Sequence, residues 1–94
     1  MREVEERKRR RAILTYLNDA PRNESSAALA VEACRALGIP TYLDQAITTI
    51  RWLHDQGLVI MREENDFVIA KLTKSGAEIA RDERTDSRIE RPFG

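Results

Sequence analysis

One histidine, His54, and one cysteine, Cys34, are the side chains of this sequence best suited to nucleophilic chemistry. A catalytic Cys–His pair needs a third group that orients the imidazole, and no motif in the sequence supplies one. Neither C-x-x-C nor H-x-x-x-H spacing occurs, so no metal site is expected. We expect His54 to lie near the C-terminal end of a helix and Cys34 to be a small packing residue.

Motifs for phosphate binding or acid–base catalysis are not found either. The four glycines are spread from Gly38 to Gly94, too far apart to form a phosphate-binding loop. The adjacent Glu63 and Glu64 are typical of a soluble turn rather than of a catalytic carboxylate pair. The sequence therefore predicts that the protein is not an enzyme and has no catalytic residue, cofactor or small-molecule substrate.

Composition limits the size and the surroundings of the protein. The 94 residues are 41% hydrophobic and 34% charged, with 16 basic and 16 acidic side chains. This length predicts one domain with a modest core. No apolar run approaches the ~20 residues that cross a bilayer, and no signal-peptide core follows the arginine-rich start, so no membrane association is expected. A single cysteine is typical of a reducing compartment and predicts a cytoplasmic location.

Positive charge is concentrated at the start of the chain. Residues 1–11 carry six basic and three acidic side chains, and we interpret them as a basic helical N-terminal extension. Two roles remain open for this extension. In the first, Arg9, Arg10 and Arg11 contact DNA phosphates. In the second, the arginines are solvated and pair with glutamates one helical turn earlier. The pairs would be Glu3–Arg7, Glu5–Arg9 and Glu6–Arg10.

Periodic apolar residues predict three helices in the first part of the chain. The first helix covers residues 1–18, and its buried face begins near Ile13. The second begins at Ser25 or Ser26, either of which can cap its first turn, and closes before Gly38. Its expected inner face consists of Leu29, Ala30, Ala33, Ala36 and Leu37.

The third helix, residues 41–56, has the clearest periodicity. Thr41 and Asp44 resemble a capping box at its start, and Gly57 ends it. Its apolar stripe consists of Leu43, Ala46, Ile47, Ile50 and Leu53. The opposite face should therefore be exposed, and it includes Thr41, Gln45, Thr48 and Trp52.

A β-hairpin and a short closing helix should follow. Residues 58–61 and 67–70 are β-prone runs on either side of a turn at Asn65-Asp66. Thr73 should cap the last helix, which Gly76 weakens slightly. We expect residues 12–83 to form the domain and residues 84–94 to form a polar C-terminal tail without a fold of its own. The fold class is therefore mainly α with a β-hairpin (α+β).

This order of elements resembles a winged helix-turn-helix domain over about residues 12–82. Leu53 followed by Gly57-Leu58-Val59, and the run Leu72 to Gly76, are similar to the L-x-x-x-G-L-V and L-T-x-x-G marks of MarR-type and related regulators. The whole chain is also similar to small uncharacterised winged-helix proteins of Mu-like phages. The resemblance implies a small phage or prophage transcriptional regulator that binds double-stranded DNA.

By this resemblance, the helix at residues 41–56 reads the major groove. The expected DNA-contacting residues on it are Thr41, Tyr42, Gln45, Thr48, Thr49 and Arg51, together with Arg9, Arg10 and Arg11 from the extension. Gln45 would bond an adenine edge, and threonine methyls would contact thymine methyls. Equally, this face could be the solvated side of an ordinary core helix. The acidic hairpin tip departs from the family pattern, because it would repel phosphate.

Trp52 is an unusual residue for an exposed helical face. Three explanations are open: packing against the N-terminal extension, a homodimer contact and a partner site, of which an interface is favoured. A dimer would place its two recognition helices about 34 Å apart. The alternative function is a winged-helix protein–protein interaction module without DNA binding, which the zero net charge, the acidic hairpin tip and Trp52 favour.

Overall fold

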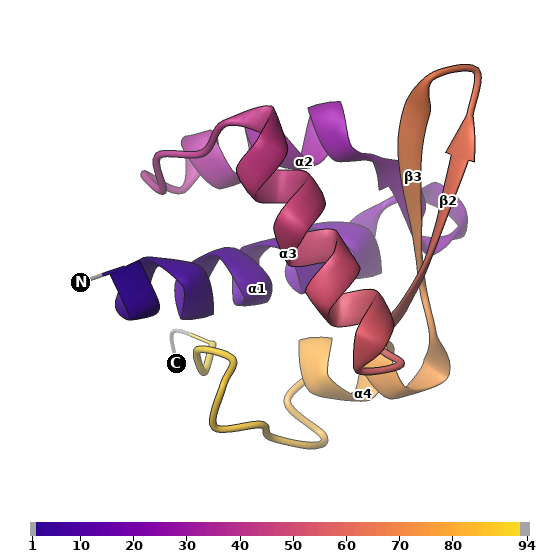
Figure 1. The fold of residues 1–94 in the computed structure, drawn as a ribbon. Helices are drawn as coiled ribbons and strands as arrows, with labels where there is room; N and C mark the ends of the chain where they lie inside the picture. Colours follow the sequence, from indigo (N-terminus) through magenta and orange to yellow (C-terminus); the bar gives the residue numbers. More distant parts are fainter. Residues whose placement is uncertain (1, 93–94) are drawn as a thin grey trace.

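Four helices and a three-stranded antiparallel sheet make up the part of the chain described by the computed structural model, residues 2–92. The elements follow the order α1 (Arg2–Asp19), η1 (Pro21–Asn23), β1 (Glu24–Ser26), α2 (Ala27–Ala36), α3 (Leu43–Asp55), β2 (Val59–Glu64), β3 (Phe67–Leu72) and α4 (Lys74–Ala80). Helix α1 lies behind α3, and the hairpin of β2 and β3 stands beside α3 (Figure 1). The expected α+β class with a hairpin is therefore confirmed. None of the helices in the described range combines the length and the apolar character that a membrane span requires.

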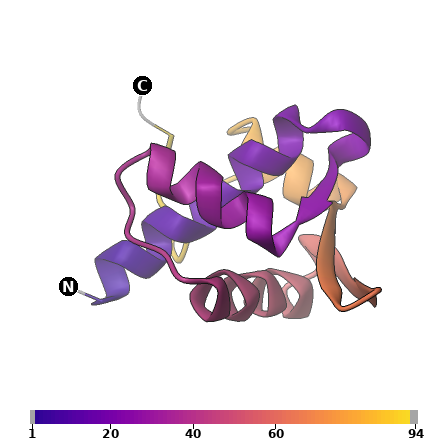
Figure 2. The ribbon, with the colours of Figure 1, turned by 90° about the horizontal axis from the view of Figure 1, so that it is seen from above.

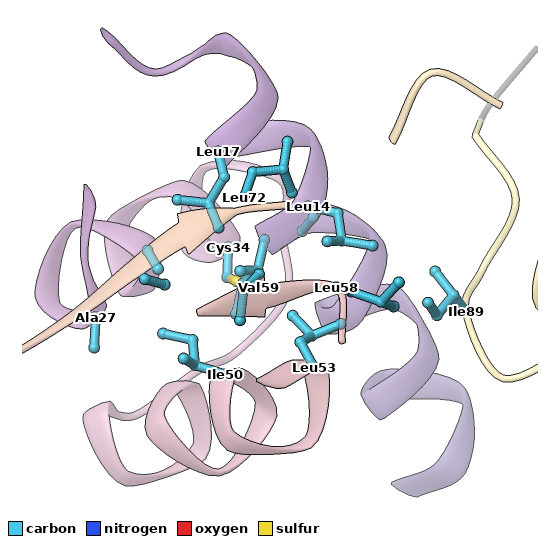
Figure 3. Close-up of a cluster of buried hydrophobic side chains, with 14 of the residues drawn as sticks. Leu14, Leu17, Ala27, Cys34, Ile50, Leu53, Leu58, Val59, Leu72 and Ile89 are labelled. Atoms are coloured by element: carbon cyan, nitrogen blue, oxygen red, sulfur yellow. The ribbon is translucent and has the colours of Figure 1, made fainter. Parts of the chain in front are cut away.

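Helix α1 is the central element, and it contacts α2, α3 and α4. Its second half turns Ile13, Leu14 and Leu17 into the core, where they are almost completely buried. The core also receives side chains from α3, the sheet and the C-terminal segment (Figure 3). The expected start of the buried stripe near Ile13 is correct for apolar residues, but two arginines before it are buried as well.

Helix α2 begins where the sequence predicts, but it faces inward with a different side. Ser26 caps it, because the Ser26 Oγ accepts a hydrogen bond from the Leu29 amide at 3.2 Å. The buried residues are Ala27, Ala30, Val31 and Cys34, whereas Leu29 and Leu37 are exposed. The predicted inner face is therefore correct at Ala30 but wrong at Leu29, Ala36 and Leu37. Alanines and other apolar residues of α2 itself occur on several sides of the helix. The hydrophobic periodicity therefore does not determine which side turns inward.

Helix α3 is positioned by Gln45 rather than by Thr41. The Tyr42 amide donates to the Gln45 Oε1 at 2.8 Å at the start of the helix. Thr41 lies in the preceding loop, almost fully buried, and its Oγ1 donates to the Ile39 carbonyl at 3.0 Å. The predicted Thr41–Asp44 capping box is therefore wrong. The apolar stripe is confirmed at Ala46, Ile50 and Leu53, but Leu43 is half exposed.

The hairpin forms at the predicted turn. Glu64 pairs with Phe67, which leaves Asn65 and Asp66 as a two-residue loop with φ values of 49° and 69°. Asn and Asp are among the residues that tolerate these left-handed conformations, which match a type I′ turn. Strand β1 was not predicted from the sequence. Its residues Glu24–Ser26 pair with β3 and make the strand order β1-β3-β2.

Thr73 and Gly76 shape the start of α4. The Thr73 Oγ1 accepts from the Gly76 amide at 3.1 Å, which confirms the predicted N-cap. Gly76 is buried against the backbone of Leu58, and a Cβ at this position would collide with the Leu58 carbonyl oxygen. Glycine therefore permits a close approach of α4 to the residue before β2, and this packing outweighs its low helix propensity.

The C-terminal segment differs from the expected polar tail. Ile89 is only 1% exposed and belongs to the hydrophobic core, where its side chain lies near Leu58 (Figure 3). The Glu90 amide donates to the Arg7 carbonyl at 3.1 Å, which ties the segment to α1. The expectation of a tail without a fold is therefore wrong for residues 84–92, and residues 93–94 lie outside the described residues. Ile89 is the one buried apolar residue among residues 84–92, and a single apolar residue does not predict from sequence that the segment packs on the domain.

Candidate nucleic-acid interface

Two of the three arginines expected to contact DNA are buried. Arg9 is 3% exposed, and it donates to the Thr41 Oγ1 at 3.1 Å and to the Pro40 carbonyl at 2.8 Å. Arg11 is 8% exposed, and it donates to the Glu90 carbonyl at 2.7 Å and the Ile79 carbonyl at 2.9 Å. Arg9 thus holds the loop before α3 against α1, and Arg11 holds the C-terminal segment and the end of α4 against α1. The expectation that the two arginines are solvated is wrong.

Arg10 is largely committed to intramolecular contacts as well. It donates to the Arg88 carbonyl at 2.9 Å and lies 3.7 Å from the Glu6 carboxylate. The predicted pairs Glu5–Arg9 and Glu6–Arg10 are confirmed. Arg7, however, pairs at 3.5 Å with Glu90 of the C-terminal segment instead of with Glu3. Burial lowers the pKa of Arg10, although the neighbouring Glu6 counteracts part of that shift.

Trp52 is half-buried, because α1 and the C-terminal segment cover it. The Arg10 guanidinium lies 3.9 Å from the centre of the Trp52 ring, and that of Arg88 lies 5.0 Å from it. Both distances are within the range of cation–π interaction. The structure thus agrees with the first explanation, packing against the N-terminal helix. A homodimer through Trp52 stays a prediction.

The exposed face of α3 is smaller than the sequence predicts. Tyr42, Thr48 and Arg51 are exposed, with Tyr42 at 69%, and Gln45 is half-buried. Thr49 is buried, and its Oγ1 donates to the Gln45 carbonyl at 2.9 Å. The expected exposure of Thr41 and Thr49 is therefore wrong. Thr41 lies in the loop before α3, where it is hydrogen-bonded to Arg9, and Thr49 lies next to the buried Ile50 on the inner part of the helix. Leu43 and Asp44, which were not predicted, complete the exposed N-terminal end of α3.

A groove of about 360 Å³ separates α1 from α3. Its walls include both acidic and basic side chains, namely Glu6, Arg10 and Asp44, together with the polar Gln45 and Thr48. Such a mixed lining gives no continuous positive surface from α3 to the N-terminal arginines. Phosphate binding by bulk charge is consequently not favoured here.

The hairpin tip is acidic and exposed. Glu63, Glu64 and Asp66 lie at or beside the turn. Arg62, just below them, donates to the Glu24 carboxylate at 2.6 Å and to the Glu64 carboxylate at 2.9 Å. The hydrogen bond from Arg62 lowers the pKa of Glu24, which keeps this pair ionised. The acidic tip would therefore repel the phosphates of a DNA backbone rather than contact them.

His54 and Cys34 take separate structural roles. His54 is exposed near the end of α3, as predicted, and its Nδ1 lies 3.3 Å from both the Met61 amide and the Val59 carbonyl. Cys34 is fully buried on α2, and burial raises the pKa of its thiol. Within residues 2–92, no three His, Cys, Asp or Glu side chains gather into a group that could hold a metal ion.

Comparisons with known proteins identified no relative of this chain. No protein-family model matches the chain, and no match was found among curated proteins or solved structures.

Proposed function

We propose that this chain is a winged helix-turn-helix DNA-binding protein, of the kind that small phage or prophage transcriptional regulators use. The helix pair α2–α3 followed by a hairpin supports this proposal, as does the placement of α3 on an outer face beside the hairpin (Figures 1 and 2). In this arrangement α3 enters the major groove. The observation that carries the proposal is the exposure of Thr48 and Arg51 on the outward side of α3, together with the exposed Tyr42 at its N-cap.

The proposed contact set is smaller than the one expected from the sequence. Thr48 and Arg51 hydrogen-bond to base edges or phosphates, and Tyr42 contacts the groove wall at the start of the helix. Gln45 uses its Oε1 to hold the Tyr42 amide, so only its Nε2 donates to DNA. It therefore cannot form the two-point contact with adenine unless the helix cap opens. Thr41, Thr49, Arg9 and Arg11 are not part of this set, because they are buried.

Affinity in this mode depends little on counterion release. With two arginines of the extension buried, only Arg51 of α3 and the partly covered Arg10 of α1 remain for phosphates in the proposed contact set. The slope of log affinity against log salt should then be about −2 or shallower, rather than the roughly −3 expected if Arg9, Arg10 and Arg11 all bound phosphates. The acidic hairpin tip reduces nonspecific binding further.

Fluorescence polarisation at low salt tests the proposal, with a random duplex pool and the DNA that flanks the gene of this protein. Arg51→Ala and Thr48→Ala should each weaken binding by about five- to tenfold, because each removes contacts worth roughly 1 kcal/mol. Arg81→Ala is the matched control, since Arg81 is exposed beyond α4. Absence of binding to any duplex, with the protein shown to be folded, would refute the proposal.

A protein–protein interaction module is the second candidate, and exposed apolar side chains favour it. Leu37, Tyr42 and Leu43 are all at least half exposed around the loop that joins α2 to α3. Such side chains are typical anchors of a protein interface. Under this alternative, Tyr42→Ser removes binding to a protein partner or lowers the mass measured by light scattering, while duplex binding is absent from the start.

A further inference from the structure

The strongest uncompensated charge in the core lies on Arg11. Its side chain is more than nine-tenths buried, yet its hydrogen bonds go to the neutral carbonyls of Glu90, Ile79 and Ala80. Among residues 2–92, no carboxylate lies within ion-pair distance of it. A buried cation without an anionic partner is costly, even when carbonyl dipoles surround it. Burial accordingly lowers the pKa of Arg11, and Asp82 acts in the opposite direction more weakly.

One nitrogen of this guanidinium remains available. The Nε and Nη1 atoms donate to the three carbonyls, whereas Nη2 makes no hydrogen bond within the described residues. Nη2 therefore keeps two N–H donors that the described residues do not use, on a side chain that lines a cavity.

Arg11 lines a cavity of about 370 Å³ between α1, the loop after α2 and the C-terminal segment. Ala12, Leu37, Ile39 and Pro92 form apolar walls, and Lys8 stands one helical turn from residue 12 on the same side of α1. Glu90 also lines the cavity, but Arg7 neutralises its carboxylate at 3.5 Å. The ionised groups around the cavity thus leave a net positive charge beside an apolar surface.

We propose that this cavity binds a small organic anion, a carboxylate with an apolar body. The carboxylate accepts from the Arg11 Nη2 and the Lys8 ammonium, and the apolar body lies against Leu37 and Ile39. The volume is within the range of small-molecule sites, about 300–1,000 Å³. This site is separate from α3, so the proposal does not depend on DNA binding, and it assigns a ligand class where the sequence analysis expected none.

Two-dimensional NMR titration with octanoate tests the proposal on the full chain. Saturable shifts should map to the amides of residues 8–12 and 37–39, with a dissociation constant of about 1 mM or tighter. Uncharged 1-octanol should bind at least about tenfold more weakly, because it lacks the charge-assisted hydrogen bonds. Shifts elsewhere on the surface, or equal affinity for the alcohol, would overturn the proposal.

Two variants avoid the structural role of Arg11. Lys8→Gln should weaken octanoate binding roughly fivefold through loss of one partly exposed charge. Leu37→Gln removes an apolar wall at a residue that is 64% exposed, so the fold should persist while binding falls. Lys74→Gln, on α4 outside the cavity, is the matched control and should change nothing. Unchanged binding in both Lys8→Gln and Leu37→Gln would rule the site out.

Discussion

The Arg10 guanidinium stacks over the Trp52 ring at 3.9 Å, which joins α1 to α3 through a cation–π contact. Because Arg10 also donates to the Arg88 carbonyl, the same side chain connects both helices to the C-terminal segment. The bulky aromatic on α3 thus stabilises the domain from within. The Trp52 indole, on a side of α3 that would be exposed without α1, thus packs against the first helix.

Loss of this contact should destabilise the protein. We expect Trp52→Ala to lower the free energy of unfolding by about 2–3 kcal/mol, because the half-buried ring and its cation–π contacts disappear together. A double-mutant cycle with Arg10→Ala, followed by urea denaturation, should give a coupling of about 0.5–1 kcal/mol. Purely additive single effects would contradict the contact. Arg51→Ala, on the exposed side of α3, is the control.

Ile89 should behave as a core residue despite its place near the chain end. Ile89→Ala should cost about 2–4 kcal/mol, because the side chain is 99% buried and its removal leaves a cavity. Thermal unfolding measures the change, and Thr85→Ala in the exposed part of the same segment is the control. An effect no larger than that of Thr85→Ala would show that the segment does not dock in solution.

Gly76 and Gly38 should respond differently to alanine. Gly76→Ala places a Cβ against the Leu58 carbonyl and should destabilise by about 3 kcal/mol or more. Gly38 has a φ of +78° with open space around it, so Gly38→Ala should cost only about 1 kcal/mol of backbone strain. Chemical denaturation of both variants makes the comparison. The opposite ranking would contradict the close packing of α4 on Leu58.

Stability should fall on acidification partly through Asp86. Hydrogen bonds from Arg88, including one of 2.7 Å, lower the pKa of the Asp86 carboxyl in the folded state. A carboxyl with a depressed pKa contributes stability above its unfolded pKa of about 4, and this contribution is lost as the pH falls through the folded value. Because its partner Arg88 is exposed and solvent screens the pair, the contribution is below about 1 kcal/mol.

Asp86→Asn tests this pH dependence. The variant should be less stable than the natural protein near neutral pH, and the difference should shrink as the pH falls below the ordinary carboxyl pKa of about 4. Urea denaturation at several pH values measures the difference, with Asp55→Asn as a control at an exposed carboxylate on α3. A stability difference that stays constant across this range would exclude the ion pair as its cause.

The sequence by itself determined the features that depend on neighbouring residues. Ser26 and Thr73 cap helices, Asn65-Asp66 forms the hairpin turn, and Ala46, Ile50 and Leu53 face the core, all as predicted. Each of these features follows from backbone preferences or from helical periodicity within a few residues. The same periodicity correctly placed Thr48 on the exposed side of α3, but it also placed Thr49 and Trp52 there, and Thr49 is buried and Trp52 half-buried.

Only the tertiary structure decided where the remaining residues lie. β1 exists because β3 offers it a partner, and the inner side of α2 depends on what α2 packs against. Arg9 and Arg11 are buried because carbonyls distant in sequence, on Pro40 and Glu90, accept hydrogen bonds from them. Such contacts join segments 31 to 79 residues apart, and local patterning carries no information about them. The physical reason is that burial of a charged side chain is a property of its final surroundings, not of its type.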